Sequence, residues 1–289
     1  MENSTFNVSR EEIERIAELS GIDVTFHETN LDYHDEAEID NANELLKELG
    51  KVAFSSGGNN FARFVAENGE RIRKLAPFND GIAELLVLGY KLGISSGSAA
   101  CMNDLGALYY MGEFVEQDYA KAAELYEMAM EHGCYQSIVN LGYIYEYGRI
   151  GKKDLERAYR CYALAVALAP SCEAVYKLGD MYSRGITGQR DLPKAKALWE
   201  RSLELADGIV ETAQPAVRIA KLLVDPSAWE QGIERDPLRA LSLYQQAEIG
   251  LRIDITVNGM TYYQRRLDEA IAGQDVARAM VETDGGVLF

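Results

Sequence analysis

The residues best suited to bind a metal ion are two histidines and two aspartates near the start of the chain, His27, Asp32, His34 and Asp35. Imidazole nitrogens and carboxylate oxygens are common metal ligands, and seven residues separate the two histidines, which suits one helical face. The segment between them is poor in helix formers, however, and no third anchor is identifiable. We therefore interpret these residues as a solvated acidic surface, and we predict no metal site and no cofactor.

Nucleophilic catalysis would need a Ser-His-Asp or Cys-His arrangement, and none stands out in the sequence. A phosphate-binding glycine loop is not evident either, because the "SSGSAAC" and "SSGG" stretches are typical of linkers. His132 precedes Gly133 at the predicted end of a helix, where an imidazole complements the helix dipole. We predict a protein that is not an enzyme, and a hydrolase with an unrecognised site is the least favoured function.

The charge of the chain excludes several classes of partner. Its 289 residues carry a net charge of −17, and residues 1–50 contribute most of it, with fourteen Asp and Glu against three Lys and Arg. Binding to a phosphate backbone or to an anionic membrane surface requires clustered Lys and Arg. We therefore predict no nucleic acid and no membrane among the partners.

Compartment and topology follow from other bulk features. No apolar run approaches the roughly 20 residues that a membrane-spanning helix requires. The first residues lack the basic start and apolar core of a secretory signal. The four cysteines form no CxxC motif, which is typical of buried thiols in a reducing compartment. These features favour a cytoplasmic location.

A phrase that recurs every 36 or 37 residues is the main feature of the sequence. A Leu-Gly pair begins each copy, a second glycine follows six residues after the first, and an aspartate follows six residues after that. The second glycine is typical of a helix end with a left-handed backbone, and the aspartate is typical of a helix N-cap. The landmarks are Leu105, Gly106, Gly112 and Asp118; Leu141, Gly142, Gly148 and Asp154; and Leu178, Gly179, Gly185 and Asp191.

Each copy therefore predicts a pair of helices that packs on the next pair. Four residues after each aspartate stands an alanine, eight residues after it an aromatic residue, and eleven residues after it a small residue. These offsets share one helical face, so the small residues allow close approach and the aromatic ring fills the gap. Charges on outer faces are free to vary. We predict an all-α fold, a right-handed superhelical α-solenoid of stacked antiparallel helix pairs.

These residues make the chain similar to the Sel1-like repeat family, a relative of the tetratricopeptide repeats. Three good copies occupy residues 99–206, and a degenerate fourth copy with an expanded loop occupies 207–251. We interpret residues 1–98 as a diverged acidic helical cap, and residues 252–289 as C-terminal capping helices and a tail. The resemblance implies a protein-interaction scaffold rather than a defined chemistry.

In tetratricopeptide-like arrays the first helix of each pair lines a concave groove, and this implies a set of groove residues here. Tyrosines interleaved with amide and cationic side chains would suit an extended peptide. If so, replacing Tyr143 and Lys177 with alanine should abolish binding and leave the melting temperature nearly unchanged. The alternative is that several tyrosines only pack between helices. The predicted partner-binding residues are Asn103, Tyr110, Asn140, Tyr143, Tyr147, Tyr176, Lys177 and Arg184.

Two functions remain open at this point. In the first, the protein is an adaptor or regulator that binds a protein or extended peptide in its groove. In the second, the acidic N-terminal region neutralises a basic partner by charge complementarity, as an immunity-type or inhibitory protein would. Neither the identity of the partner nor the oligomeric state follows from the sequence.

Overall fold

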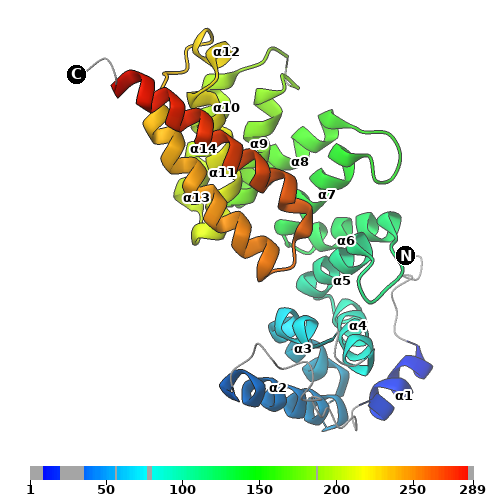
Figure 1. Ribbon diagram of the computed structural model, residues 1–289. Coiled ribbons are helices and arrows are strands. Elements are labelled where there is room, and N and C mark those ends of the chain that lie inside the picture. Colours follow the sequence, from blue (N-terminus) through cyan, green and yellow to red (C-terminus); the bar gives the residue numbers. More distant parts are fainter. Residues whose placement is uncertain (1–8, 20–35, 56, 77–79, 187, 286–289) are drawn as a thin grey trace. The chain divides into compact units, whose positions relative to one another are not determined.

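The computed structural model describes residues 9–19, 36–55, 57–76, 80–186 and 188–285, and Figure 1 shows that these residues form helices joined by turns. None of the described residues lies in a β-strand. The contacts divide the chain into two units, residues 1–141 and 142–289, which we describe separately. The helices of the repeating part are α5 (Ala99–Met111), α6 (Tyr119–Glu131), α7 (Gln136–Tyr147), α8 (Leu155–Leu168), α9 (Cys172–Ser183), α10 (Leu192–Leu205), α11 (Ile209–Leu223), α12 (Pro226–Trp229) and α13 (Pro237–Thr256).

The helices come in the predicted pairs, α5 with α6, α7 with α8, α9 with α10, and α11 with α13. The dividing point between the units falls within α7, because a stacked array has similar contacts along its length. The segment predicted as an expanded loop contains the short helix α12. The boundaries proposed at residues 98, 206 and 251 stay predictions; the last of them lies inside α13.

The predicted aspartate caps are present at the start of all four second helices. The Oδ1 atom of each aspartate accepts a hydrogen bond from the backbone N–H three residues later, at 2.9–3.0 Å. Gly112, Gly148 and Gly185 have φ angles of 71°, 65° and 70°, the left-handed backbone expected at a helix end. Asp118, Asp154, Asp191 and Asp236 are the four capping residues.

The landmark residues of the second helices are packing residues, as predicted. All of them are at most 4% exposed, and the aromatic ring of the second helix lies against the glycine of the first. A Cβ atom added to Gly142 would lie 2.4 Å from Cε1 of Tyr162, so a larger residue would force the helices apart. The buried set is Ala122, Tyr126, Ala129, Ala158, Tyr162, Ala165, Ala195, Trp199, Ser202, Ala240, Tyr244 and Ala247.

A basic residue three positions after the capping aspartate has a role that the sequence did not reveal. The cationic groups of Lys121, Arg157 and Lys194 lie 5.2, 5.5 and 4.1 Å from the centre of a tyrosine ring on the preceding first helix. In the fourth pair, Leu223 stands in place of this tyrosine, and Arg239 instead forms an ion pair with Glu200 at 3.0 Å. The cation–π contact therefore belongs to the regular copies only.

The N-terminal part of the first unit contains α1 (Arg10–Leu19), α2 (Glu36–Ser55), α3 (Gly57–Leu75) and α4 (Asp80–Ser95). A capping box begins α1, since Ser9 N donates to Glu12 Oε2 at 2.8 Å and Glu12 N donates to Ser9 Oγ at 3.2 Å. Apolar residues of these helices form one core with α5 and α6. The candidate metal ligands at positions 27, 32, 34 and 35 lie outside the described residues.

The C-terminal end of the second unit consists of α13, the 3₁₀ turn η3 (Thr261–Tyr263) and α14 (Gln264–Gly285). Helix α14 packs on α13 so closely that a Cβ atom added to Gly273 would lie 2.3 Å from Cζ of Tyr244. It therefore covers the aromatic ring of Tyr244; the assignment of residues 252–289 as a cap stays a prediction. Within the described residues, no helix combines the length and the apolar character needed to cross a membrane.

Candidate interaction face on the first helices

In the first unit, the structure joins two of the three predicted groove residues. Asn140 Nδ2 donates to Asn103 Oδ1 at 2.9 Å, and Asn103 Nδ2 donates to Asp104 Oδ1 at 3.1 Å. Tyr110 packs edge-on against Tyr119 at the start of α6, with ring centres 5.3 Å apart. The first helices of this unit thus carry a ladder of neutral amides that ends on one carboxyl group.

In the second unit, Lys177 lies at the centre of the predicted set. Its Nζ atom is 4.6, 5.6 and 5.4 Å from the ring centres of Tyr143, Tyr147 and Tyr162 and 2.6 Å from Oε2 of Glu146. The Lys177 side chain is only 3% exposed. Its position on the first-helix face agrees with the prediction, but its depth does not, because a partner cannot reach an ammonium group that other side chains cover.

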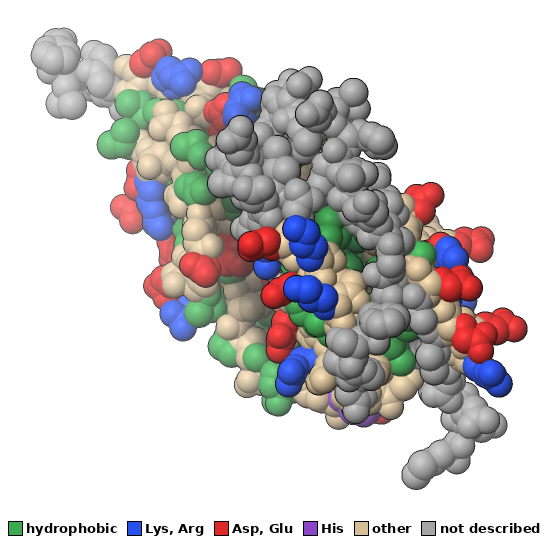
Figure 2. All heavy atoms as spheres, turned by 90° about the horizontal axis from the view of Figure 1, so that it is seen from below, with side chains coloured by type: hydrophobic (Ala, Val, Ile, Leu, Met, Phe, Trp, Pro, Cys, Tyr) green, Lys and Arg blue, Asp and Glu red, His purple; other side chains and the backbone are tan. Residues whose placement is uncertain are grey.

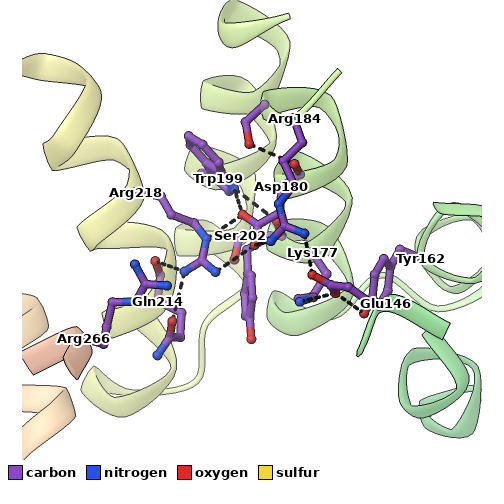
Figure 3. Close-up of polar contacts among 12 residues, drawn as sticks. Glu146, Tyr162, Lys177, Asp180, Arg184, Trp199, Ser202, Gln214, Arg218 and Arg266 are labelled. Carbon is purple, nitrogen blue, oxygen red and sulfur yellow. Dashed lines mark hydrogen bonds and ion pairs between the residues drawn. The ribbon is translucent and has the colours of Figure 1, made fainter. Parts of the chain in front are cut away.

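Glu146 connects three groups within this unit (Figure 3). Besides Lys177, it accepts a hydrogen bond from the Tyr162 hydroxyl at 2.8 Å and one from Arg184 Nη1 at 2.7 Å. The Glu146 side chain is 2% exposed, whereas that of Arg184 is 44% exposed. Arg184 therefore binds the buried network at one end and exposes part of its cationic side chain at the surface.

A second ion pair lies beside the first. Arg218 on α11 binds Asp180 on α9 through two bonds, Nε to Oδ1 at 2.6 Å and Nη2 to Oδ2 at 2.8 Å. Trp199 Nε1 donates to the same Asp180 Oδ1 at 3.1 Å, and Gln214 accepts from Arg218 Nη1. Figure 3 shows these side chains converging from α9, α10 and α11. Asp180 thus holds neighbouring helix pairs together.

The tyrosines complete the cluster. The Tyr143 hydroxyl donates to Glu173 Oε1 at 2.6 Å and lies 3.1 Å from the Tyr176 hydroxyl. The rings of Tyr143 and Tyr147 are nearly parallel, with centres 6.0 Å apart. Tyr176 is 7% exposed, so it packs between helices, whereas Tyr147 is 46% exposed. Tyr176 therefore fits the alternative that tyrosines pack between helices, and a contact of Tyr147 with a partner stays a prediction.

Burial and charge shift the pKa values of this network in definite directions. Burial alone would raise the pKa of Glu146, but Lys177 and Arg184 together lower it below its ordinary value. The same two effects compete at Asp180. Burial would raise its pKa, but Arg218 has the larger effect, and the pKa is lowered. Burial lowers the pKa of Lys177, and Glu146 offsets only part of that effect. Both carboxylates are therefore held in their charged forms.

Two members of the network are available to a partner, Tyr147 and Arg184. The Arg184 guanidinium is oriented by Glu146, and Tyr147 is oriented by the Tyr143 ring beneath it. Aromatic rings and guanidinium groups are the side chains that most often dominate protein interfaces. Fixed orientation lowers the entropy that binding would otherwise cost. The surface offers an aromatic ring and a guanidinium group, which are suited to an aromatic contact and a charge-assisted hydrogen bond.

The face shows no arrangement for metal chemistry. No group of three or more histidine, cysteine or carboxylate side chains with metal-binding geometry exists within the part of the chain that the structure describes. Cys101 and Cys172 are buried, and burial raises the pKa of both thiols, which keeps them protonated and unreactive.

The sequence matches the family model of the Sel1 repeat at residues 99–134, 136–169, 172–207 and 228–248. The chain contains Sel1 repeats. We number these four matches repeats 1 to 4. The first three coincide with the three copies predicted from the landmark spacing. Repeat 4 is matched over part of α12, the following turn and most of α13, in agreement with a degenerate copy whose first helix has lost the family pattern.

Solved structures agree with this assignment of the fold. A Sel1 repeat protein from Oxalobacter formigenes is 18% identical, with 84% of this chain and 99% of that chain covered and a TM-score of 0.57. A protective antigen of uropathogenic Escherichia coli that displays an SLR fold is 15% identical, with coverage of 84% and 66% and a TM-score of 0.44. A comparison with curated proteins finds none that matches. The first likeness shows a Sel1 repeat α-solenoid fold.

Sequence reasoning placed Glu146 and Asp180 on the groove side of repeats 2 and 3 but did not select them, and it missed Arg218. Selection favoured tyrosines and cations because these are typical of binding surfaces, whereas both carboxylates are buried beneath them. Arg218 lies on the first helix ahead of the repeat 4 match, where the landmark leucine and glycine are replaced. One signal was available in the sequence. Glu146 and Asp180 are charged residues that stand among aromatic and apolar neighbours on the first helices.

Proposed function

We propose that this chain is a non-enzymatic interaction scaffold, an adaptor or regulator that binds a protein or extended peptide on the first-helix face of its second unit. Tyr147 and Arg184 make the first contacts, and the residues beneath them keep both side chains in place. Sel1 repeats are generally protein–protein interaction scaffolds, which supports the proposal without identifying a partner.

The observation that carries the proposal is that the ionic network is not part of the framework of the repeat. Five residues after the landmark leucine, the first helices have Tyr110, Glu146 and Ser183, although every landmark is retained. Buried ion pairs often stabilise a fold no better than apolar side chains of the same volume. Their presence here favours a role in orienting Tyr147 and Arg184 rather than in folding.

Affinity purification of the full-length chain from its native cells tests the proposal. The test variant carries Tyr147→Ala and Arg184→Gln. The matched control carries Leu164→Ala and Arg160→Gln, which remove one exposed apolar residue and one exposed arginine from the second helix α8. Urea denaturation checks that both variants remain folded.

A protein that the wild type and the control retain and the test variant loses supports the proposal. That protein must also bind the purified wild-type chain directly, with a dissociation constant at least tenfold lower than for the test variant. If the test variant and the control retained every protein equally, the face would not be a binding site.

The charge of the N-terminal residues favours a second candidate, an acidic surface that neutralises a basic partner. Much of that charge lies outside the described residues, and on the face drawn in Figure 2 the described acidic and basic side chains are interleaved. Salt distinguishes the two functions. Capture that collapses between low and moderate salt and ignores Tyr147→Ala would favour the acidic surface.

A further inference from the structure

The turns that join the two helices of repeats 2 and 3 are strongly basic, on a chain whose net charge is −17. They cover residues 148–153 and 184–190, and their described residues contain no aspartate or glutamate. All of their cationic side chains belong to exposed residues. These side chains are Arg149, Lys152, Lys153, Arg184 and Arg190, which we call the basic edge.

The described residues of the two turns share their glycine positions and a backbone hydrogen bond. The first and fourth residues of each turn segment 148–151 and 185–188 are glycines with positive φ. In both, the N–H of the later glycine donates to the carbonyl of the earlier one, at 3.3 and 3.2 Å. Lys153 and Arg190 therefore stand at the same place, directly before the capping aspartate of each second helix.

Repeat 1 does not share the basic residues. At the positions of Arg149, Lys152 and Lys153 it has Glu113, Glu116 and Gln117. Its turn also has a different backbone, with the positive φ of 59° at Phe114, and Glu113 forms an ion pair with Arg73 on α3. The basic residues therefore belong to the turns of repeats 2 and 3, which contain two glycines each.

Three of these cations form no ion pair with a described carboxylate. They are Lys152, Lys153 and Arg190. Exposed cations attract acidic groups of a partner. The edge is therefore suited to receive several negative charges at once.

The basic edge is continuous with the interaction face. The guanidinium of Arg149 lies 5.6 Å from the ring centre of Tyr147. Arg184 belongs to both surfaces, since it begins the second turn and binds Glu146 at 2.7 Å. A segment that contacts Tyr147 therefore lies beside Arg149, and Arg184 binds the residue that precedes Tyr147 in the chain.

We propose that the segment bound on this face is acidic, with carboxylates that contact the basic edge and a neighbouring apolar or aromatic residue that packs on Tyr147. This inference rests on the proposed function and adds the chemistry of the partner. A protein segment fits better than a nucleic acid, because a few carboxylates can approach the edge without exposing a long polyanion to the net charge of −17.

Fluorescence anisotropy with defined probes tests this inference. The acidic probe is a labelled peptide of three Glu-Gly-Tyr-Glu repeats, and matched probes have Gln or Lys in place of Glu. A labelled oligothymidylate represents nucleic acid. The edge variant of the full-length chain carries Arg149→Gln, Lys152→Gln, Lys153→Gln and Arg190→Gln.

The control variant removes the same number of exposed cations, four arginines on second and terminal helices of the same unit, so both variants have the same net charge. It carries Arg160→Gln, Arg201→Gln, Arg252→Gln and Arg278→Gln. We expect the acidic probe to bind the wild type and the control alike, and to bind the edge variant about tenfold more weakly.

Several results would overturn the inference. Equal loss in both variants would mean that net charge alone attracts the probe. If the Gln or Lys probe bound more strongly than the acidic probe, the face would bind peptides without a preference for acidic ones. The proposed function would then still hold. Selective binding of the oligothymidylate would assign the edge to nucleic acid, and no binding of any probe would also reject the inference. Failure of the proposed function itself would appear instead in the Tyr147 and Arg184 purification.

Discussion

The first helices of the two units use the same landmarks but carry different polar ladders. In the first unit, the ladder consists of Asn140, Asn103 and Asp104, and its hydrogen bonds join amides and one carboxyl group. In the second unit, the equivalent face holds two buried ion pairs, Glu146 with Lys177 and Asp180 with Arg218. The framework of the repeat therefore accepts either chemistry, and the polar face is where the copies have diverged.

The difference also appears in the protonation of two buried aspartates. Burial raises the pKa of Asp104, and the nearby Asn103 and Arg73 offset only part of that shift. Asp180 is more deeply buried than the partly buried Asp104, but Arg218 lowers its pKa instead. A carboxylate that is buried without an adequate cation lowers the stability of the fold at neutral pH. A carboxylate that is buried with a bidentate guanidinium does not.

The largest effect should come from Glu146→Ala. It leaves Lys177 buried without its carboxylate, so we expect the free energy of unfolding to fall by about 3–5 kcal/mol. In the first unit, Asn140→Ala removes one neutral hydrogen bond and should lower it by only about 1 kcal/mol. Urea denaturation of both variants measures the comparison. Equal losses would mean that removing one partner from the ionic ladder costs no more stability than removing one partner from the amide ladder.

The pH dependence of stability should separate Asp180 from Asp104. The unfolded pKa of an aspartate is about 3.9. Because the folded pKa of Asp180 is lower, its contribution is present above that value and is lost as the pH falls through the folded pKa. The Asp180→Asn variant should therefore be strongly destabilised at pH 7. The difference between its free energy of unfolding and that of the wild type should become smaller at acidic pH.

Asp104 should behave in the opposite way. Its folded pKa is raised, so between about 3.9 and that folded value the native state binds more protons, and stability falls as the pH rises. Asp104→Asn should be as stable as the wild type at pH 7 or more stable. Chemical denaturation from acid to neutral pH measures both variants, and parallel curves would contradict the assigned environments.

Substitution of the close-approach glycines should affect the two units alike. An added Cβ atom would lie 2.8 Å from the Tyr126 ring at Gly106 and 2.4 Å from the Tyr162 ring at Gly142. We expect Gly106→Ala and Gly142→Ala each to cost about 1–3 kcal/mol, as overpacked cores do. A large difference between them in thermal or urea melts would show that the units also differ in their framework.

Removal of a helix cap should have the smallest effect, again similar in both units. Asp118 and Asp191 each accept backbone N–H groups at the start of a second helix. Asp118→Ala and Asp191→Ala should each lower stability by about 1 kcal/mol. Asparagine at either position caps nearly as well, so Asp118→Asn and Asp191→Asn serve as controls and should recover most of the loss.

The repeat framework was predictable because its residues act locally. Gly112 ends a helix, Asp118 begins the next one, and Tyr126 fits against Gly106, all within one copy of the phrase. Spacing alone therefore identified the helix pairs, their caps and their contact positions. The closing helix α14 was predictable as well, although its contact with Tyr244 was not.

The candidate site was less predictable because its contacts join different copies. Asp180 and Arg218 are 38 residues apart, and Arg218 lies where the family pattern is degenerate. Periodicity placed Lys177 on the correct face but gave no measure of depth, since three tyrosine rings from α7 and α8 cover its ammonium group. The expectation that Tyr143 and Lys177 could be replaced without loss of stability is therefore withdrawn.

The central claim is that the Glu146–Lys177 ion pair of the second unit serves the interaction face rather than the fold, and one double variant tests it most directly. Glu146→Leu with Lys177→Met replaces a buried pair by apolar side chains of similar volume, which often leaves stability unchanged. It also removes the carboxylate that orients Arg184. We predict an unfolding free energy close to that of the wild type, together with loss of the protein that the wild type captures and the α8 control retains. A stable double variant that still captures this protein with unchanged affinity would contradict the account.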